Sequence, residues 1–269
     1  MEVIKRAVEK VVTELAVVLV TRPFDIDQTY DLLENTVREH DEIFGSAAAV
    51  RQRHEDAAEP SVTTIPYVYR DEGRIVRKDL AAGDYPFATH DWYYLPEERR
   101  APVWTEPYYD EGGGDSIMVT YSVPIITGED GQFRGIVTGD LCLDWLQGML
   151  DSMELPEEGR AFLISRKGTI IAGPVAEMIM RESVFSIAQR YNSEEMRRVG
   201  ESMTRAETGF VEFRGFRDRV DYWLAYAPVP DTGWSLGAMF PQEQITATLF
   251  ELSRLKFILG IAGAIAMII

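Results

Sequence analysis

Two apolar runs, residues 117–126 and 133–143, are joined by a short turn that begins at Thr127 and ends at Gly131. Each run is long enough to form a strand, and the turn supplies glycine and polar residues of the kind that close hairpins. Runs that are apolar almost throughout are typical of strands in the middle of a sheet. The sequence therefore predicts a central antiparallel hairpin around which the rest of the fold is arranged.

The segments before this hairpin add helices and more strands. Residues 63–80 alternate between apolar and polar and are divided near Gly73, which predicts another antiparallel hairpin. Residues 1–20 carry apolar side chains at helical spacing. A second helix is predicted over residues 28–44, with Asp27 as its cap. This mixture is typical of the α+β class.

An aromatic segment, residues 81–115, lies between the two predicted hairpins and is interrupted by four prolines. Such a segment makes poor regular structure. Loops held on a rigid scaffold often carry recognition residues, and aromatic side chains give them stiff contact area. The segment is therefore a candidate for a binding site.

A smaller block repeats the mixture after residue 155. A hairpin with its turn at Gly168, a helical stretch over residues 183–206 and three later extended segments are predicted there. We therefore expect a long N-terminal helix and two tandem subdomains, each a mixed antiparallel sheet flanked by helices. The predicted boundaries are residues 1–44 for a stalk helix and a second helix, 45–154 for the larger subdomain, 155–241 for the smaller one and 242–269 for a C-terminal helix.

Composition excludes several classes of protein. Lys and Arg number 27 against 44 Asp and Glu, a net charge of −17 that disfavours nucleic acid as a partner. The single cysteine, Cys142, cannot form an internal disulfide. The chain has no GxSxG, HExxH or GxxxxGK[ST] motif, and His40, His54 and His90 lack the spacing of zinc ligands. No catalytic site, metal site or cofactor is predicted.

The last residues, 257–269, form an uninterrupted run of apolar residues and glycine. Because a membrane-spanning helix needs about 20 apolar residues, we interpret the run as the beginning of such a helix. A buried amphipathic helix is the alternative. The helical stripe on residues 1–20, which has charges between its apolar positions, is not itself a span and predicts packing against a partner helix in a homodimer.

Three stretches together resemble the double Cache sensor domain of bacterial membrane receptors. They are residues 91–96 (DWYYLP), residues 102–110 (PVWTEPYYD), and residues 121–125 (YSVPI) with residues 135–141 (GIVTGDL). Residues 159–173 and 223–236 resemble the membrane-proximal half of such domains, particularly those that precede metal-dependent serine phosphatase modules. The resemblance covers nearly the whole of residues 1–250.

The resemblance implies an extracytoplasmic module, anchored in the cell membrane, whose membrane-distal half, here residues 45–154, binds a small molecule. It also implies a cytoplasmic output module, which would be a phosphatase, a kinase or a chemotaxis module. The positions that match those holding an amino acid in the family, together with nearby aromatic residues, are Tyr85, His90, Trp92, Tyr93, Trp104, Tyr108, Asp110, Tyr121 and Asp140.

His90 stands where amino-acid-binding members have an arginine. A guanidinium offers a fixed pair of donors to a carboxylate, whereas a mostly neutral imidazole offers at most one uncharged donor. The two acids Asp110 and Asp140, surrounded by aromatic rings, suit a positive charge instead. The sequence therefore favours a cationic amine over an α-amino acid as the ligand.

Plainer interpretations stay open for the same residues. Trp92 and Tyr93 could be core aromatics, and Asp110 could cap the turn before residues 112–114. Asp140 interrupts an apolar strand, so its carboxyl needs a partner or a place at a pocket wall. A calcium ion held by Asp110 and Asp140 is a further alternative.

We therefore expect the sensing part of a transmembrane receptor and no enzyme activity. An alternative is a module that binds no small molecule and serves for dimerisation or protein docking. An extracytoplasmic hydrolase would need a nucleophile beside a positioned base, and the sequence offers no such pair.

Overall fold

The computed structural model describes residues 2–52, 60–127, 131–153, 155, 158–230 and 232–244. The predicted membrane-entering run 257–269, most of the C-terminal helix 242–269, the middle of the turn at Thr127 and His54 lie outside the described residues. The chain divides into two compact units. We call Ile4–Leu143 the N-terminal unit and Met1–Val3 with Asp144–Ile269 the C-terminal unit.

The N-terminal unit contains one antiparallel sheet with the strand order β3-β2-β1-β7-β6-β4, and β5 also pairs with β6. Its elements are α1 (Glu2–Thr21), α2 (Ile26–Glu39), β1 (Gly45–Val50), β2 (Pro66–Asp71), β3 (Arg74–Asp79), the 3-10 turn η1 (Phe87–Thr89), α3 (Asp91–Arg99), β4 (Val103–Trp104), β5 (Tyr108–Tyr109), β6 (Ile117–Thr127) and β7 (Gln132–Cys142). The predicted hairpins are confirmed as β2–β3 and β6–β7, and the second of these contributes two neighbouring inner strands.

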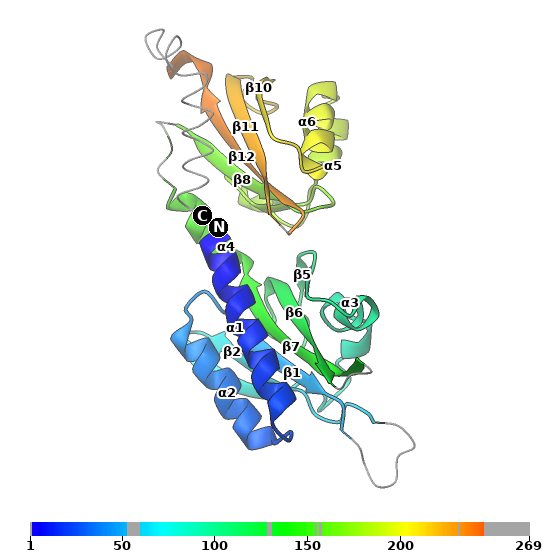
Figure 1. Cartoon of the computed structure of the whole chain (residues 1–269). Coiled ribbons are helices and arrows are strands. Elements are labelled where there is room, and N and C mark those ends of the chain that lie inside the picture. The colour runs from blue at the N-terminus through cyan, green and yellow to red at the C-terminus, as the bar shows by residue number, and fades with distance from the viewer. Residues whose placement is uncertain are drawn as a thin grey trace. The chain divides into compact units, whose positions relative to one another are not determined.

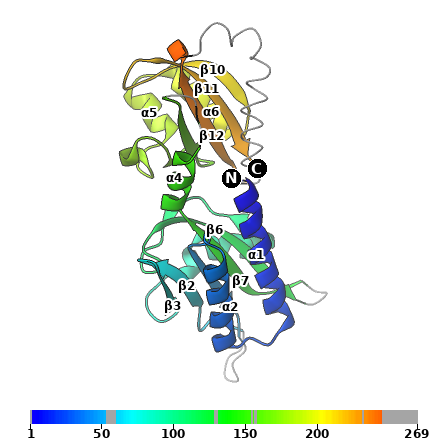
Figure 2. The ribbon, with the colours of Figure 1, turned by 90° about the vertical axis from the view of Figure 1, so that its left-hand side faces the viewer.

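Helix α1 packs on one face of this sheet. Val8 and Val12 are completely buried, and a side chain at Gly139 of β7 would collide with Val12. The helical stripe thus covers its own sheet, which Figures 1 and 2 show as α1 lying along β7. This differs from the predicted packing against a partner helix, because the sheet itself supplies the apolar surface. Among the side chains of residues 5–21 that the structure describes, the exposed large apolar ones lie near the end of the helix, with Val17 58% exposed.

The opposite face carries α3 and the aromatic segment (Figure 1). Trp92 and Tyr93 of α3 form one buried cluster with Ala47, Ala49 and Ile136 of the sheet. Residues 81–115 are thus more regular than the sequence predicted. Pro96 lies inside α3, and the helix ends at Arg99. The next residue, Arg100, has a left-handed backbone and donates its N–H to the Pro96 carbonyl.

The C-terminal unit contains a second antiparallel sheet with the order β10-β11-β12-β8-β9. Its elements are α4 (Leu143–Asp151), β8 (Arg160–Ile164), β9 (Ile170–Ala172), η2 (Ala176–Met178), α5 (Val184–Arg190), α6 (Glu194–Thr204), β10 (Gly209–Arg214), β11 (Asp221–Val229), β12 (Trp234–Pro241) and η3 (Gln242–Gln244). Both sheets are antiparallel and accompanied by helices, which confirms the predicted α+β class.

Two local features differ in position from the sequence expectation. The helical stretch 183–206 is two helices, because Asn192 adopts a left-handed backbone and Ser193 caps α6. The division between the units falls at Leu143 rather than near residue 154. Helix α4 belongs to the C-terminal unit, since Gln147 accepts a hydrogen bond from the Gly173 N–H at 2.8 Å.

Candidate ligand site

Two buried carboxyl groups lie in the aromatic side of the N-terminal unit. Asp140 is on β7, where it is opposite Gly45 of β1 and Thr120 of β6. Asp110 directly follows β5. Each residue is 3% exposed. Strand alternation places Asp140 on the sheet face opposite Gly139, which faces α1, so the carboxyl points to the side covered by α3 and the aromatic segment.

Asp110 is held by a turn and by an aromatic pair. Its carboxylate accepts the Gly114 N–H at 2.8 Å and the Tyr85 hydroxyl, and the Trp92 indole N–H donates in turn to the Tyr85 oxygen at 3.2 Å. Gly113 is required here, because a Cβ at that position would lie 2.0 Å from the carboxylate. A chain of neutral donors, Trp92 to Tyr85 to Asp110, thus ends on the first acid.

Asp140 ends a second chain of donors. The Thr120 hydroxyl donates to its carboxylate at 2.8 Å, and the Tyr108 hydroxyl lies 2.8 Å from the Thr120 oxygen. Since the one hydroxyl hydrogen of Thr120 goes to Asp140, Tyr108 is the donor in its contact with Thr120. The Tyr67 hydroxyl is buried without a hydrogen bond of ordinary geometry. It nevertheless lies close enough to Asp140 to lower the pKa of that residue.

Burial and the neighbouring Asp110 charge raise the pKa of Asp140 to about 8, while Thr120 and Tyr67 act in the opposite direction. Burial, and then the same acids, also raise the pKa values of Tyr67, Tyr85 and Tyr108 well above the ordinary range. Within the described ranges neither Asp110 nor Asp140 forms an ion pair with a lysine, arginine or histidine. Asp140 therefore retains a proton at neutral pH. Because no described cation pairs with either acid, a bound positive charge could take the place of that proton.

His90 contacts the aromatic rings of Tyr85 and Tyr108, both of which are beside the acids. Its ring stacks on Tyr85 with centroids 4.9 Å apart and meets Tyr108 edge-on at 5.9 Å. A lysine also reaches this region, because the Lys78 ammonium donates to the Gly113 carbonyl at 3.2 Å, in the turn that holds Asp110. The site thus has a cationic side chain beside its turn, although that side chain is not paired with either acid.

Of the nine residues predicted for the site, the structure brings together Tyr85, His90, Trp92, Tyr108, Asp110 and Asp140 through the contacts above. Tyr93 packs edge-on against Trp92, at 5.9 Å, but also against Phe133 at 6.4 Å. Arg51 acts on its hydroxyl and offsets part of the pKa rise that burial causes. Tyr93 is therefore connected to the acidic cluster through its ring contact with Trp92.

Trp104 and Tyr121 lie elsewhere. The Trp104 indole donates to Glu9 of α1 at 2.9 Å, and its ring is 5.1 Å from that of Tyr121. Successive side chains of a strand point to opposite faces, so Tyr121 faces α1 because Thr120 faces Asp140. These two predicted residues belong to the α1 face of the sheet and not to the acidic cluster.

Three participants were missed by the sequence prediction. The predicted hairpin brings Thr120 close to residue 140 along the chain, but Thr120 lies directly opposite Asp140 only because the register shifts between Ile125 and Ile126, which the sequence did not indicate. Tyr67 and Lys78 come from the β2–β3 hairpin, where they are directly paired. The sequence predicted that hairpin but not its position beside β1, so nothing in it placed these side chains near Asp140.

Comparison with known proteins identifies the type of domain. Residues 29–148 match the model of the first PDC sensor domain of methyl-accepting chemotaxis protein-like proteins. Most of the N-terminal unit therefore matches the model of a PDC sensor domain. Methyl-accepting chemotaxis protein McpC of Bacillus subtilis is 28% identical over 189 residues, which are 70% of this chain and 26% of that receptor. McpA of Pseudomonas putida is 26% identical over 66% of this chain and 27% of its own length. The chain thus spans about a quarter of these relatives.

Solved structures share the fold over both units. The extracellular domain of mmHK1S-Z3, described as a histidine kinase, has a TM-score of 0.76 at 21% identity and covers 93% of this chain and 92% of its own. The ligand-binding domain of Mlp24 with asparagine has a TM-score of 0.60 at 19% identity, with 90% and 86% covered. That of Campylobacter jejuni chemoreceptor Tlp3 with L-valine has 0.59 at 14%, with 91% and 88% covered. The chain therefore has the PDC/Cache sensor fold.

Two kinds of feature are absent from the described residues. No helix there is long and apolar enough to cross a membrane. No group of three or more His, Cys, Asp or Glu side chains in the same ranges is arranged to hold a metal ion.

Proposed function

We propose that this chain is the extracytoplasmic sensor of a double Cache membrane receptor and that the Asp110–Asp140 cluster binds the positive group of a small amine. The observation that carries the proposal is the burial of two acids in one cluster without an ion pair among the described residues. A buried carboxylate is stable only when it is paired, hydrogen-bonded or protonated. A bound ammonium would replace the proton that Asp140 otherwise keeps.

The aromatic surroundings support the same ligand class. The rings of Tyr85, His90 and Tyr108 contact one another beside the acids, and an ammonium gains about 0.5–2 kcal/mol over an aromatic face. All three side chains and both acids are held by hydrogen bonds or ring contacts within one unit, so the cluster is preorganised. Because both acids are 3% exposed, a ligand could reach them only if part of the aromatic segment moved aside.

An amino acid is the second candidate. Structures of the same fold contain asparagine and L-valine, and an α-amino acid carries an ammonium that suits the two acids. His90 cannot replace a guanidinium at the carboxylate end. Lys78, beside Gly113, supplies a permanent positive charge that could do so as a point charge.

Isothermal titration calorimetry with alkyl amines and matched α-amino acids tests both candidates. We expect saturable amine binding that falls by about 100-fold or more in Asp140→Asn, because the amide cannot lose a proton and so cannot supply the buried negative charge that would pair with the ammonium. Asp31→Asn is the matched control, since Asp31 is an exposed acid of the same unit. Amine binding that is equal in wild type and Asp140→Asn would refute the site.

Lys78→Met separates the two ligand classes. We expect it to weaken amino acids about tenfold and to leave simple amines unchanged, because only amino acids carry a carboxylate. Equal losses for both classes would assign Lys78 to the structure of the turn instead of to the ligand.

A receptor of this type would pass the signal on through its helices. Binding can shift an equilibrium only by its different affinity for two arrangements, and shifts of about 1–2 Å at helix interfaces are a usual carrier. The named relatives are chemotaxis receptors, which makes a chemotaxis output module the first candidate over the phosphatase module suggested by the C-terminal half of the sequence. Homodimerisation stays a prediction, with the exposed Val17 and Val20 as the described apolar residues available for it.

A dimerising or docking module that binds no small molecule is the competing proposal. A thermal-shift screen of amines and amino acids that leaves the melting temperature unchanged, together with a crosslinked dimer, would favour it.

A further inference from the structure

The C-terminal unit contains a cavity of about 70 Å³ between its sheet and its helices. The walls come from β8 to β12, from η2 and from α5 and α6. All of these elements belong to one unit, and the acidic cluster belongs to the other. The cavity is therefore a separate feature from the candidate site described above.

Every residue that lines this cavity is apolar, glycine or proline. A buried water needs two to four polar partners, so such a cavity stays dry. Native cores contain few voids larger than one water molecule, and a cavity of about 10–15 Å³ is enough to hold one. A dry void of about 70 Å³ is several times larger, which is an unusual loss of packing contacts unless something fills it.

The cavity extends from the interior toward the surface. Met203 and Ile187 are 1% exposed, whereas Phe162, Met178, Phe216 and Met239 on the same lining are only partly buried. A small molecule could therefore enter by displacing partly exposed side chains, without separation of the helices from the sheet.

The lining combines flexible side chains with helices that are closely packed against each other. Four of the chain's ten methionines, Met178, Met196, Met203 and Met239, lie on it. Methionine is unbranched and flexible, and surfaces rich in it accept ligands of different shapes. By contrast α5 and α6 are in close contact, because a Cβ at Gly200 would lie 2.7 Å from Val184. The backbone frame of α5 and α6 is fixed, while the methionine side chains on α6, η2 and β12 can change rotamer.

We propose that this cavity is a second binding site, which takes a small uncharged apolar molecule such as a short alkyl group or a single aromatic ring. The lining offers no polar side chain to hold a charge or a hydrogen-bonding group, so amines and amino acids are excluded from it. The ligand class is thus opposite to that of the acidic cluster, and the two sites would report different chemicals.

The test uses the whole chain with ¹³C-labelled methionine methyl groups, titrated with xenon, benzene and toluene. We expect saturable shifts of the signals of Met178, Met196, Met203 and Met239, with no shift of Met118 in the N-terminal unit. Absence of saturable shifts with all three probes, or equal shifts of Met118, would overturn the proposal.

Two substitutions change the cavity volume in opposite directions and should change ligand affinity accordingly. Val199→Phe fills the cavity and should weaken benzene binding at least about tenfold, since one methylene in an apolar pocket is worth about 10–200-fold. Met203→Ala enlarges the cavity and should strengthen benzene and toluene relative to xenon. Ile171→Ala is the control for Met203→Ala, because Ile171 is also fully buried in the same unit but does not line the cavity.

The outcomes remain decisive if one variant is unstable. Val199→Leu is a milder filling variant, and far-ultraviolet circular dichroism identifies any variant that has not folded. Benzene affinity that is the same in wild type, in a folded filling variant and in Met203→Ala would show that the probe binds elsewhere.

Discussion

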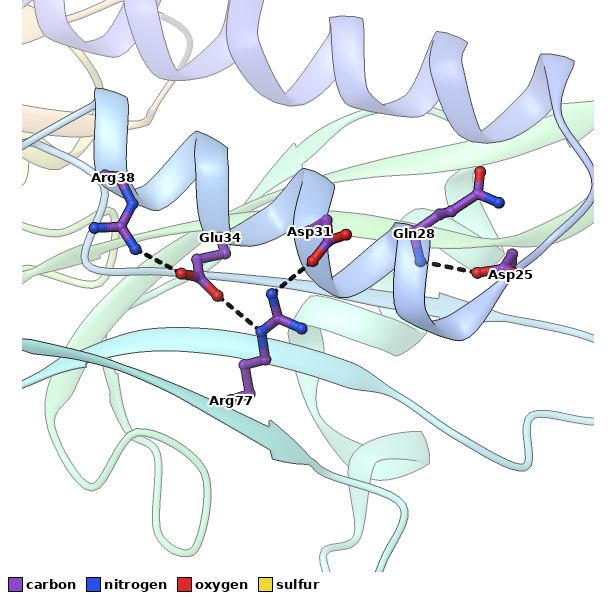
Figure 3. Close-up of polar contacts among 6 residues, drawn as sticks. All are labelled: Asp25, Gln28, Asp31, Glu34, Arg38 and Arg77. Carbon is purple, nitrogen blue, oxygen red and sulfur yellow. Dashed lines mark hydrogen bonds and ion pairs between the residues drawn. The ribbon is translucent and has the colours of Figure 1, made fainter.

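The N-terminal unit contains two groups of acids in opposite environments. At the surface between α2 and β3, Arg77 donates to Asp31 and to Glu34, both at 2.7 Å, and Arg38 also binds Glu34, while Asp25 caps the helix (Figure 3). In the interior, the donors that Asp110 and Asp140 receive from the part of the chain that the structure describes are neutral, and they come from tyrosine, threonine and a backbone N–H.

The difference appears in the protonation of the two groups. Hydrogen bonds from Arg77 and Arg38 lower the pKa of Glu34, whereas burial and the Asp110 charge raise that of Asp140. Asp31 and Glu34 are already paired with arginine, so they have little left to offer a ligand. The interior acids are the ones that a positive ligand can still stabilise. An acid is thus a candidate for binding a cation when it has no cationic partner in the protein. The number of acids in the chain does not by itself indicate a binding site.

The largest expected effect of this contrast is on the pH dependence of stability. The pKa of Asp140, about 8 in the folded chain, exceeds that of an unfolded aspartate, about 4. The folded chain therefore binds a proton that the unfolded chain has lost. The contribution of Asp140 to the free energy of unfolding is complete below pH 4 and falls up to pH 8, by at most about 1.4 kcal/mol per pH unit. Urea denaturation across this range measures it.

Asp140→Asn is the control for this experiment, since the amide resembles the protonated acid. Surface acids such as Glu34, whose pKa is lowered, lose their contribution as the pH falls below about 4.5, and they do so in both proteins. The difference between wild type and variant isolates Asp140. Parallel stability curves from pH 4 to pH 8 would mean that Asp140 is ionised in the folded chain.

The next effect concerns ligand binding and depends on the proposed amine site. If a cation replaces the proton on Asp140, amine affinity should increase as the pH is raised toward 8, by up to about tenfold per pH unit. Above pH 8 the affinity should stay constant. Calorimetry in two buffers with different ionisation enthalpies should detect up to one proton released per amine bound at pH 7. Binding without proton release would place the amine away from Asp140.

The sequence identified the interior acids better than it identified their surroundings. Asp140 could be chosen because it interrupts an apolar strand, and the β6–β7 hairpin could be predicted because both strands and the turn are continuous in sequence. Trp104 and Tyr121 were misplaced because residue type was available but the face of the strand was not. The two-residue strand β4 is too short for alternation to assign a face.

Long-range placement explains the remaining misses. Tyr67 lies near Asp140 because β1 pairs with both β2 and β7, a pairing between segments far apart in sequence. The stripe of α1 was correctly interpreted as apolar, but the surface it covers is formed by residues more than 100 positions later. Local patterns predict elements, and they do not say which element packs against which.

A smaller effect is expected from the neutral donors around the acids. Trp92→Phe keeps an aromatic ring but removes the indole N–H that donates to Tyr85 at 3.2 Å. One hydrogen bond of this kind contributes about 1 kcal/mol, so the free energy of unfolding should fall by about that amount. Urea denaturation at pH 7 measures the change. A loss above about 3 kcal/mol would mean that the substitution disturbs the aromatic packing as well.

The smallest effect is expected at the surface. Arg77→Gln removes two ion pairs, but Arg77 is 41% exposed and Asp31 is 67% exposed, so each pair contributes roughly 0.2–1 kcal/mol and is screened by salt. The stability difference between wild type and this variant should therefore shrink between about 0.05 M and 1 M sodium chloride. The difference between wild type and Asp140→Asn at neutral pH should not shrink in the same way, because Asp140 is buried and protonated in the folded chain and forms no exposed ion pair there that salt could screen. Equal salt sensitivity of the two differences would mean that Asp140 is as accessible to solvent as Asp31, and the contrast between the two groups of acids would fail.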